Sequence, residues 1–232
     1  MRKMNDPAER LEIIRNRIAD ACRAAGRDPA GVRLLAVSKT HPAGRVREFA
    51  GAGQREFGEN RLEEALEKQA KLGDLRLVWH FIGHIQSRKT REIAHRFDWV
   101  QSADREKVLR RLSAQRPEGA PPLNICLQVN IDREPQKSGA DPGEVPALAA
   151  LVAELPRLRL RGLMCLPRQT DDEEALRASF AATRRLYESL RAAAPGLDTL
   201  SMGMSGDLEA AIAEGSTMVR VGTALMGARA PT

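Results

Sequence analysis

The feature that most constrains the fold is an alternation of strand-like and helix-like segments that repeats eight times along the chain. Several strand-like segments are continuous apolar runs, as expected for parallel strands that helices cover. We expect strands at residues 32–37, 55–58, 77–82, 99–101, 123–129, 158–166, 199–202 and 218–221. Eight repeats within 232 residues favour a closed barrel, and a doubly wound open sheet is the alternative architecture.

Helix-like segments separate these strands, and one more precedes the first strand. In that N-terminal segment Asp6 is the expected cap and Pro7 the first-turn residue. Before the seventh strand, Thr170 and Glu173 have the spacing of a capping box. We expect the other helices at residues 43–52, 61–72, 86–95, 105–114, 144–155 and 207–213, with a short one from 223. The predicted fold class is α/β: a single (β/α)8 barrel of the TIM type with an extra N-terminal helix, one domain over residues 1–232.

The composition narrows the functions that such a barrel can serve. Basic residues outnumber acidic ones by 37 to 31, which leaves nucleic-acid binding as one alternative. Aromatic residues make up only 3%, however, so stacking platforms for bases are scarce and we expect no nucleic-acid partner. No apolar run approaches the roughly 20 residues of a membrane span, and the N-terminus lacks an apolar signal core. Three widely separated cysteines fit a reducing compartment, so we expect a cytoplasmic protein without membrane contact.

The loops after the last two predicted strands have the composition of a phosphate-binding site. Gly203, Ser205 and Gly206 follow the seventh strand, and Gly222 and Thr223 follow the eighth. Small residues let backbone N–H groups approach an anion, and helix N-termini favour negative charge. Barrels often bind phosphate at these two loops. The alternative is that both loops are ordinary capped turns.

Lys39 comes directly after the first predicted strand and is therefore expected at the same end of the barrel as the two loops. A lysine whose pKa is lowered by burial becomes a nucleophilic amine. The alternative is a surface lysine that extends into solvent. A ligand with both a phosphate and an aldehyde would satisfy the lysine and the loops together. Arg220 lies two residues before Gly222, so we expect it to point toward such a ligand.

Other chemistries find little support in the sequence. His80 and His84 have a spacing that suits a metal pair only on a helix, whereas here they lie on a strand and at its end. We therefore expect His80 inside the barrel, His84 in the following loop, and no metal site. The chain also lacks the Gly-x-Ser-x-Gly turn of serine hydrolases.

Six segments carry a resemblance to a known family. They are AVSKTHP (36–42), FGENRLEE (57–64), WHFIGHIQSRK (79–89), VNIDREPQKSGA (129–140), RGLMCLP (161–167) and LSMGMSGDLEAAIAEGSTMVRVGTALMGAR (200–229). In this order they resemble the pyridoxal phosphate homeostasis protein family, whose fold is related to the N-terminal domain of alanine racemase. The resemblance implies pyridoxal 5'-phosphate (PLP) as cofactor, held as a Schiff base on Lys39.

The resemblance also implies the surroundings of the cofactor. Four residues are expected around its phosphate: Ser201, Gly203, Gly222 and Thr223. Arg220 is expected to face the pyridine nitrogen, and three residues are expected to line the pocket: Asn60, His80 and Met164. Cys165 falls where a small or hydroxyl residue is common in the family, and we expect little consequence, although a thiol beside the aldehyde could form a reversible adduct.

The function implied is PLP homeostasis rather than catalysis. Racemisation needs a base on each face of the substrate, and the one tyrosine, Tyr187, is predicted on a helix. An arginine at the pyridine nitrogen also makes the ring a weaker electron sink. We expect a monomeric cofactor carrier without catalytic residues, whose partners are PLP, free amino acids and the apoenzymes that receive PLP. The alternatives are an amino-acid racemase of the alanine racemase type and a sugar-phosphate barrel enzyme.

Overall fold

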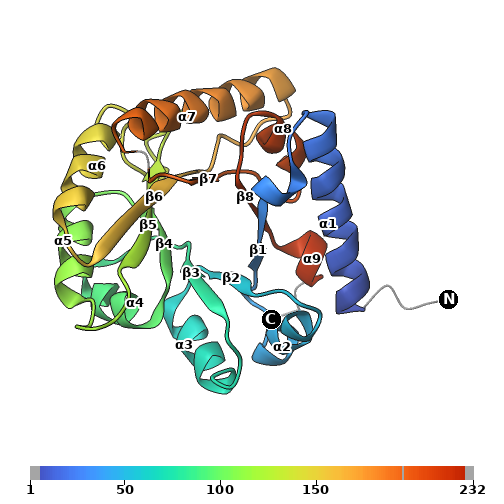
Figure 1. Cartoon of the computed structure of the whole chain (residues 1–232), viewed down its shortest axis with the longest axis horizontal. Coiled ribbons are helices and arrows are strands. Elements are labelled where there is room, and N and C mark those ends of the chain that lie inside the picture. The colour runs from blue at the N-terminus through green and yellow to red at the C-terminus, as the bar shows by residue number, and fades with distance from the viewer. Residues whose placement is uncertain (1–5, 195, 228–232) are drawn as a thin grey trace.

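The strands close into a barrel, as predicted, so the open doubly wound sheet is excluded (Figure 1). The computed structural model describes residues 6–194 and 196–227. Its strands are β1 (Arg33–Val37), β2 (Glu56–Glu59), β3 (Val78–Phe81), β4 (Trp99–Ala103), β5 (Leu123–Val129), β6 (Leu158–Cys165), β7 (Thr199–Ser201) and β8 (Met218–Val221). Each strand is parallel to its neighbour in chain order, and β8 closes the barrel by pairing with β1, from Arg33 beside Met218 to Ala36 beside Val221.

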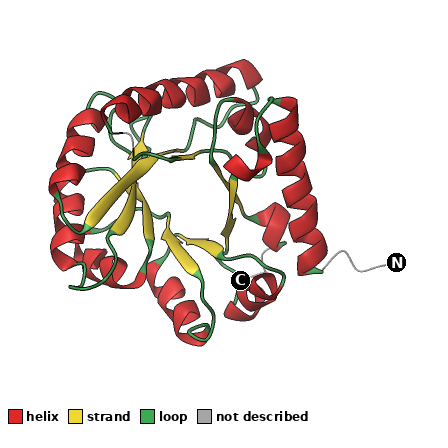
Figure 2. Cartoon of the chain, viewed as in Figure 1, coloured by secondary structure: helices red, strands yellow, loops and turns green. Residues whose placement is uncertain are grey.

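Helices surround the strands on the outside of the barrel (Figure 2). They are α1 (Pro7–Ala24), α2 (Ala43–Gly51), α3 (Leu62–Lys71), α4 (Thr90–Arg96), α5 (Glu106–Gln115), α6 (Val145–Glu154), α7 (Glu173–Ala193), α8 (Leu208–Ala213) and α9 (Thr223–Met226). Short 3-10 turns, η1 (Pro29–Gly31) and η2 (Ser87–Lys89), lie before β1 and α4. None of the helices described is long and apolar enough to cross a membrane.

The extra N-terminal helix is confirmed, and its cap is the predicted one. The side chain of Asp6 accepts a hydrogen bond from the backbone N–H of Ala8 at 3.0 Å. Apolar residues on one face of α1, among them Leu11, Ile14 and Ile18, are buried. This face packs beside α8 and α9, so the additional helix covers the last two repeats of the barrel (Figure 1).

The predicted capping box at the start of α7 is wrong. Asp172, and not Thr170, is the N-cap: its carboxylate accepts from the N–H groups of Glu174 and Ala175 at 2.9 and 3.1 Å. Thr170 instead accepts from the N–H of Asp172 at 3.0 Å. A carboxylate is as strong an N-cap as a hydroxyl, and in this segment it stands next to the first helical residue.

Two layers of side chains fill the molecule. The larger layer lies between the strands and the helices and is apolar, with residues such as Phe49, Phe57 and Phe180 fully buried. Inside the barrel, Trp99, Cys126 and Met164 form a small separate apolar cluster. The remaining interior is unusually polar, because four buried polar side chains share it: His80, Gln101, Ser201 and Arg220.

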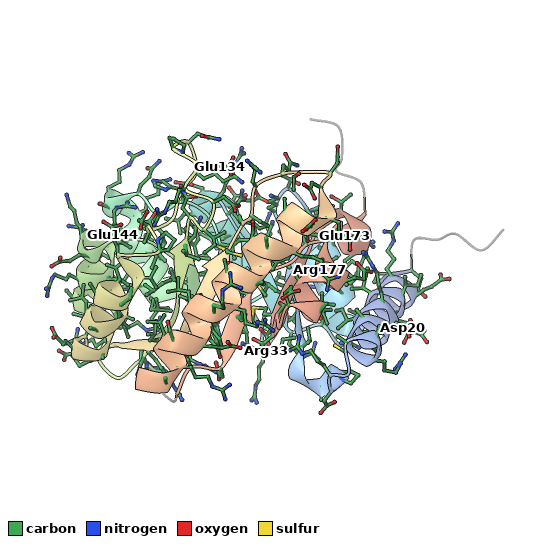
Figure 3. The ribbon with its side chains drawn as sticks, turned by 90° about the horizontal axis from the view of Figure 1, so that it is seen from above. Asp20, Arg33, Glu134, Glu144, Glu173 and Arg177 are labelled. Atoms are coloured by element: carbon green, nitrogen blue, oxygen red, sulfur yellow. The ribbon has the colours of Figure 1, made fainter. Side chains whose placement is uncertain are left out.

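The barrel has two distinct ends because all its strands run in one direction. Arg33 begins β1 and marks the end where the strands start, and Glu134, in the loop after β5, marks the end where they finish. The side view places these two residues near opposite edges of the molecule (Figure 3). The predicted site residues follow strand ends, so they should gather at the end marked by Glu134.

Candidate functional site

A cavity of about 500 Å³ opens at the carboxyl ends of the strands. Six of the predicted site residues line it: Lys39, Asn60, Met164, Arg220, Gly222 and Thr223. They come from the ends of β1, β2, β6 and β8, which are far apart in the sequence. The volume lies within the range of small-molecule sites, about 300 to 1,000 Å³. The cavity is therefore large enough for a cofactor of the size of PLP.

Lys39 lies on a tightly held segment at the end of β1. It is partly exposed and lines the cavity. Ser38, which precedes it, is fully buried and donates its hydroxyl to Glu59 Oε1 at 2.6 Å. Thr40, which follows it, has a φ of +67°, a left-handed conformation that is uncommon outside glycine. The N–H of Thr40 donates to Glu64 Oε1, so the segment is anchored on both sides of Lys39.

Both anchoring carboxylates, Glu59 and Glu64, are held in turn by the buried side chain of Lys68. Lys68 Nζ lies 2.6 Å from Glu59 Oε1 and 2.6 Å from Glu64 Oε1. It also donates to the backbone oxygen of Ser38 at 2.7 Å. The side chains of Lys68 and Glu59 are only 5% and 0% exposed. Burial raises the pKa of Glu59, and the charge of Lys68 offsets this only in part. This pair was not among the predicted site residues, and it determines where the backbone carries Lys39.

Arg220 brings a buried positive charge to the cavity wall. Its Nη1 donates to the backbone oxygen and the hydroxyl of Ser201 at 2.7 and 2.8 Å, and its Nη2 donates to the oxygen of Cys165 at 2.8 Å. Burial lowers the pKa of Arg220, but a guanidinium stays protonated at neutral pH. No carboxylate within the described residues pairs with it, so the cavity carries an excess of positive charge that favours an anionic ligand.

The turn after β8 lies at the cavity as predicted. Gly222 is the N-cap of α9, and Thr223 is the first residue of that helix; both line the cavity. The turn after β7 contributes three further residues: Met204, Ser205 and Gly206. Gly203 is not among the lining residues. Its φ is +94°, and a Cβ there would lie 2.6 Å from the Cβ of Ala211, so this glycine lets the turn pack against α8.

His80 and Ser201 lie inside the barrel rather than in the cavity lining. His80 is fully buried, which confirms that it points inward, and its ring stacks on Trp99 with centroids 5.1 Å apart. Ser201 is also fully buried, and its hydroxyl accepts a hydrogen bond from Arg220 Nη1. Both residues stand on strands one layer below the cavity. Their predicted contacts with the cofactor, like that of Gly203, stay predictions.

Several lining residues were missed by sequence reasoning. His84, predicted only as a loop residue, is exposed and lines the cavity together with Ile82 and Gly83. A Cβ on Gly83 would lie 2.1 Å from the backbone oxygen of Asn60, so only glycine lets the loops after β2 and β3 meet. Leu166 and Met204, large apolar side chains that are 36% and 40% exposed, lie at the rim. The sequence signal that could have identified these lining residues is their position shortly after the ends of predicted strands.

Cys165 does not face the cavity. Its neighbour Met164 points inward and lines the cavity, and successive side chains of a strand point to opposite faces. The thiol of Cys165 therefore lies in the apolar layer, against Thr183 of α7, and burial raises its pKa to about 11. The thiol of Cys165 therefore does not reach the cavity in which the aldehyde of PLP was expected. Within the described ranges, no group of three His, Cys, Asp or Glu residues is arranged to hold a metal ion.

Comparison with known proteins agrees with this picture. Residues 10–230 match the family described as "Alanine racemase, N-terminal domain", the class of barrel that this fold and cavity define. A pyridoxal phosphate homeostasis protein of Pseudomonas aeruginosa is 60% identical over 226 residues, and the match covers 97% of each chain. The chain belongs to the pyridoxal phosphate homeostasis protein family.

Solved structures separate this family from its enzymatic fold relatives. The structure of PipY from Synechococcus elongatus PCC7942, with PLP bound, is 40% identical and superposes with a TM-score of 0.83 over 95% of this chain and 100% of that chain. The alanine racemase of Corynebacterium glutamicum is only 17% identical, with a TM-score of 0.69 over 95% of this chain and 64% of that chain. The similarity to the racemase is therefore one of fold alone.

Proposed function

We propose that this chain binds PLP in the cavity at the carboxyl end of the barrel and takes part in PLP homeostasis. One observation carries the proposal: the amine of Lys39, the buried guanidinium of Arg220 and the turn at Gly222 meet around one cavity. These groups match an aldehyde, a pyridine ring nitrogen and a phosphate. The names of the relatives, and the PLP in the PipY structure, support the same ligand.

Each group of the cavity has a place in this proposal. Lys39 would hold PLP as a Schiff base, and the N–H groups at the start of α9, with the hydroxyl of Thr223, would bind the phosphate. Arg220 would face the ring nitrogen, and Asn60 and Met164 would line the pocket around the cofactor. When bound, PLP supplies an aldehyde that condenses reversibly with amines, which lets the protein retain the cofactor and still release it to another amine.

Homeostasis, rather than catalysis, suits the lining of the cavity. The ionisable side chains that line it are those of Lys39, His84 and Arg220, and His84 is exposed at the end of a loop. Tyr187 lies on α7 and does not line the cavity. We propose that residues 1–232 are one PLP-binding domain that works as a cytoplasmic monomer, exchanges with free amino acids and supplies apoenzymes.

Titration of the apoprotein with PLP tests the binding proposal. We expect saturable binding with a new absorbance band in the visible range, and much weaker binding of pyridoxal, which lacks the phosphate. Equal affinities for the two compounds would contradict a phosphate site in the cavity.

The Thr223→Val variant tests the phosphate site more finely. Thr223 is exposed at the cavity and its hydroxyl is proposed to donate to the phosphate. Loss of a hydrogen bond to a charged group costs about 1.5 to 3 kcal/mol, so PLP affinity should fall by one to two orders of magnitude. Pyridoxal serves as the internal control, because its affinity should be unchanged. A similar loss for both compounds would mean that Thr223 acts on the shape of the loop and not on the phosphate.

Proton exchange at the amino-acid α-carbon tests the absence of catalysis. Because the lining offers no well-placed second base, alanine or serine in deuterium oxide should exchange its α-proton no faster with the loaded protein than with free PLP. NMR measures the exchange directly. Exchange at ordinary enzyme rates would mean that the protein is a catalyst. His84, and not the buried His80, would then be the first candidate base to examine.

A further inference from the structure

A continuous row of polar side chains crosses the inside of the barrel and ends at the cavity. Arg220 Nη1 lies 2.8 Å from Ser201 Oγ, which lies 2.7 Å from Gln101 Oε1. Gln101 Nε2 lies 2.9 Å from His80 Nδ1. His80 Nε2 lies 3.2 Å from a carboxylate oxygen of Glu56, in a contact that lacks the alignment of a hydrogen bond. The row therefore connects the cavity to the opposite end of the barrel, where Glu56 begins β2.

The chemistry of the groups permits only one direction of donation near the cavity. A guanidinium can only donate, so Ser201 Oγ accepts from Arg220 and must donate its own proton onward. The amide oxygen of Gln101 accepts that hydrogen bond, which turns the amide NH2 toward His80 Nδ1. His80 Nδ1 is then the acceptor, and the ring proton resides on Nε2, next to Glu56. Burial lowers the pKa of His80, in agreement with a neutral ring.

The middle of the row is held more rigidly than a surface network would be. His80, Gln101 and Ser201 are 0% exposed. The ring of His80 stacks on Trp99, and the guanidinium groups of Arg33 and Arg161 lie over the ring of Trp99 at 4.9 and 4.5 Å. Water does not reach these side chains, so each hydrogen bond is strong and each rotation that breaks one is costly.

We propose that Gln101 and Ser201 are positioning residues that hold the guanidinium of Arg220 in place at the cavity wall. This inference rests on the proposed function and gives Ser201 and His80 a role although neither lines the cavity. The hydroxyl of Ser201 is oriented to accept from Arg220 because it donates to the amide oxygen of Gln101, and His80 keeps that amide in the orientation that allows this. Removal of Gln101 or of the Ser201 hydroxyl should loosen Arg220 without removing any side chain that lines the cavity.

The first test needs no cofactor. In the apoprotein, NMR should find slow rotation about the Nε–Cζ bond of Arg220, and Ser201→Ala and Gln101→Leu should make it measurably faster. Ser201→Thr keeps the hydroxyl and should retain slow rotation. Thr90→Val is the matched control, since Thr90 is a fully buried hydroxyl on α4 outside the row. Unchanged rotation in both Ser201→Ala and Gln101→Leu would overturn the proposal.

The second test uses PLP titration and the absorbance of the bound cofactor. Ser201→Ala and Gln101→Leu should weaken PLP binding about tenfold and shift the absorbance band, while Ser201→Thr and Thr90→Val should do neither. In an Arg220→Met background the effect of Ser201→Ala should disappear, because both changes remove one interaction. Full additivity would contradict the proposal.

If Arg220→Met does not fold, the Ser201→Thr rescue decides instead, and loss of binding in that variant counts against the proposal. Failure of the unchanged protein to bind PLP would refute the proposed function itself, a result distinct from either outcome.

Discussion

Replacement of Lys39 by Ala should eliminate the covalent attachment of PLP. Lys39 is the one lysine among the residues that line the cavity, and its backbone is fixed on both sides by Ser38 and Thr40. In the unchanged protein, borohydride reduction should place a pyridoxyl group on Lys39, and peptide mapping should find it there. In Lys39→Ala the visible absorbance band and the label should both be lost, although weaker non-covalent binding through the phosphate site should remain.

Lys137 provides the control for this prediction, because it is a rival lysine in the loop after β5. Its Nζ donates to the backbone oxygen of Pro167 at 2.9 Å and pairs with Glu134 at 2.5 Å, and it does not line the cavity. Lys137→Arg should therefore leave the absorbance band and the label unchanged. A pyridoxyl group found on Lys137, or a band that persists in Lys39→Ala, would refute the assignment of Lys39.

Replacement of Lys68 by Met should be the most destabilising of the single changes considered. It would leave Glu59 fully buried with its carboxylate facing no cation, and would remove the donor to the oxygen of Ser38. Loss of one partner of a buried ion pair costs about 3 to 5 kcal/mol. Urea unfolding should show a loss of that size. PLP affinity should fall as well, because the segment that carries Lys39 loses its anchors.

Two further variants test whether the unpaired buried charge of Glu59 causes the loss of stability in Lys68→Met. Lys68→Met combined with Glu59→Leu removes both charges, and it should recover most of the lost stability because the uncompensated carboxylate is gone. Lys89→Met breaks the ion pair of Lys89 with Glu63, whose side chain is 68% exposed, and should cost less than about 1 kcal/mol. A double variant as unstable as Lys68→Met alone would contradict the explanation by a stranded charge.

The architecture could be predicted because it depends on patterns that are local in the sequence. Apolar runs such as 123–129 and 218–221 coincide with β5 and β8, and the cap of α1 at Asp6 depends on a contact only two residues away. Predicted ends elsewhere differ by one to four residues, where turn geometry decides. The helix expected from residue 86, for example, begins with the 3-10 turn η2, and α4 starts at Thr90.

The sequence by itself determined the barrel, the family and the groups at strand ends, namely Lys39, Arg220 and the turn at Gly222. Only the tertiary structure decided which polar residues reach the cavity and which stand behind it. His80 and Ser201 lie in the layer below the lining residues, joined to each other through Gln101, and their expected contacts with the ligand stay predictions. The three side chains come from β3, β4 and β7, and the anchors of Lys39 come from β2 and α3. Such contacts depend on the height at which each strand crosses the barrel, which closure of the sheet sets and no local pattern encodes.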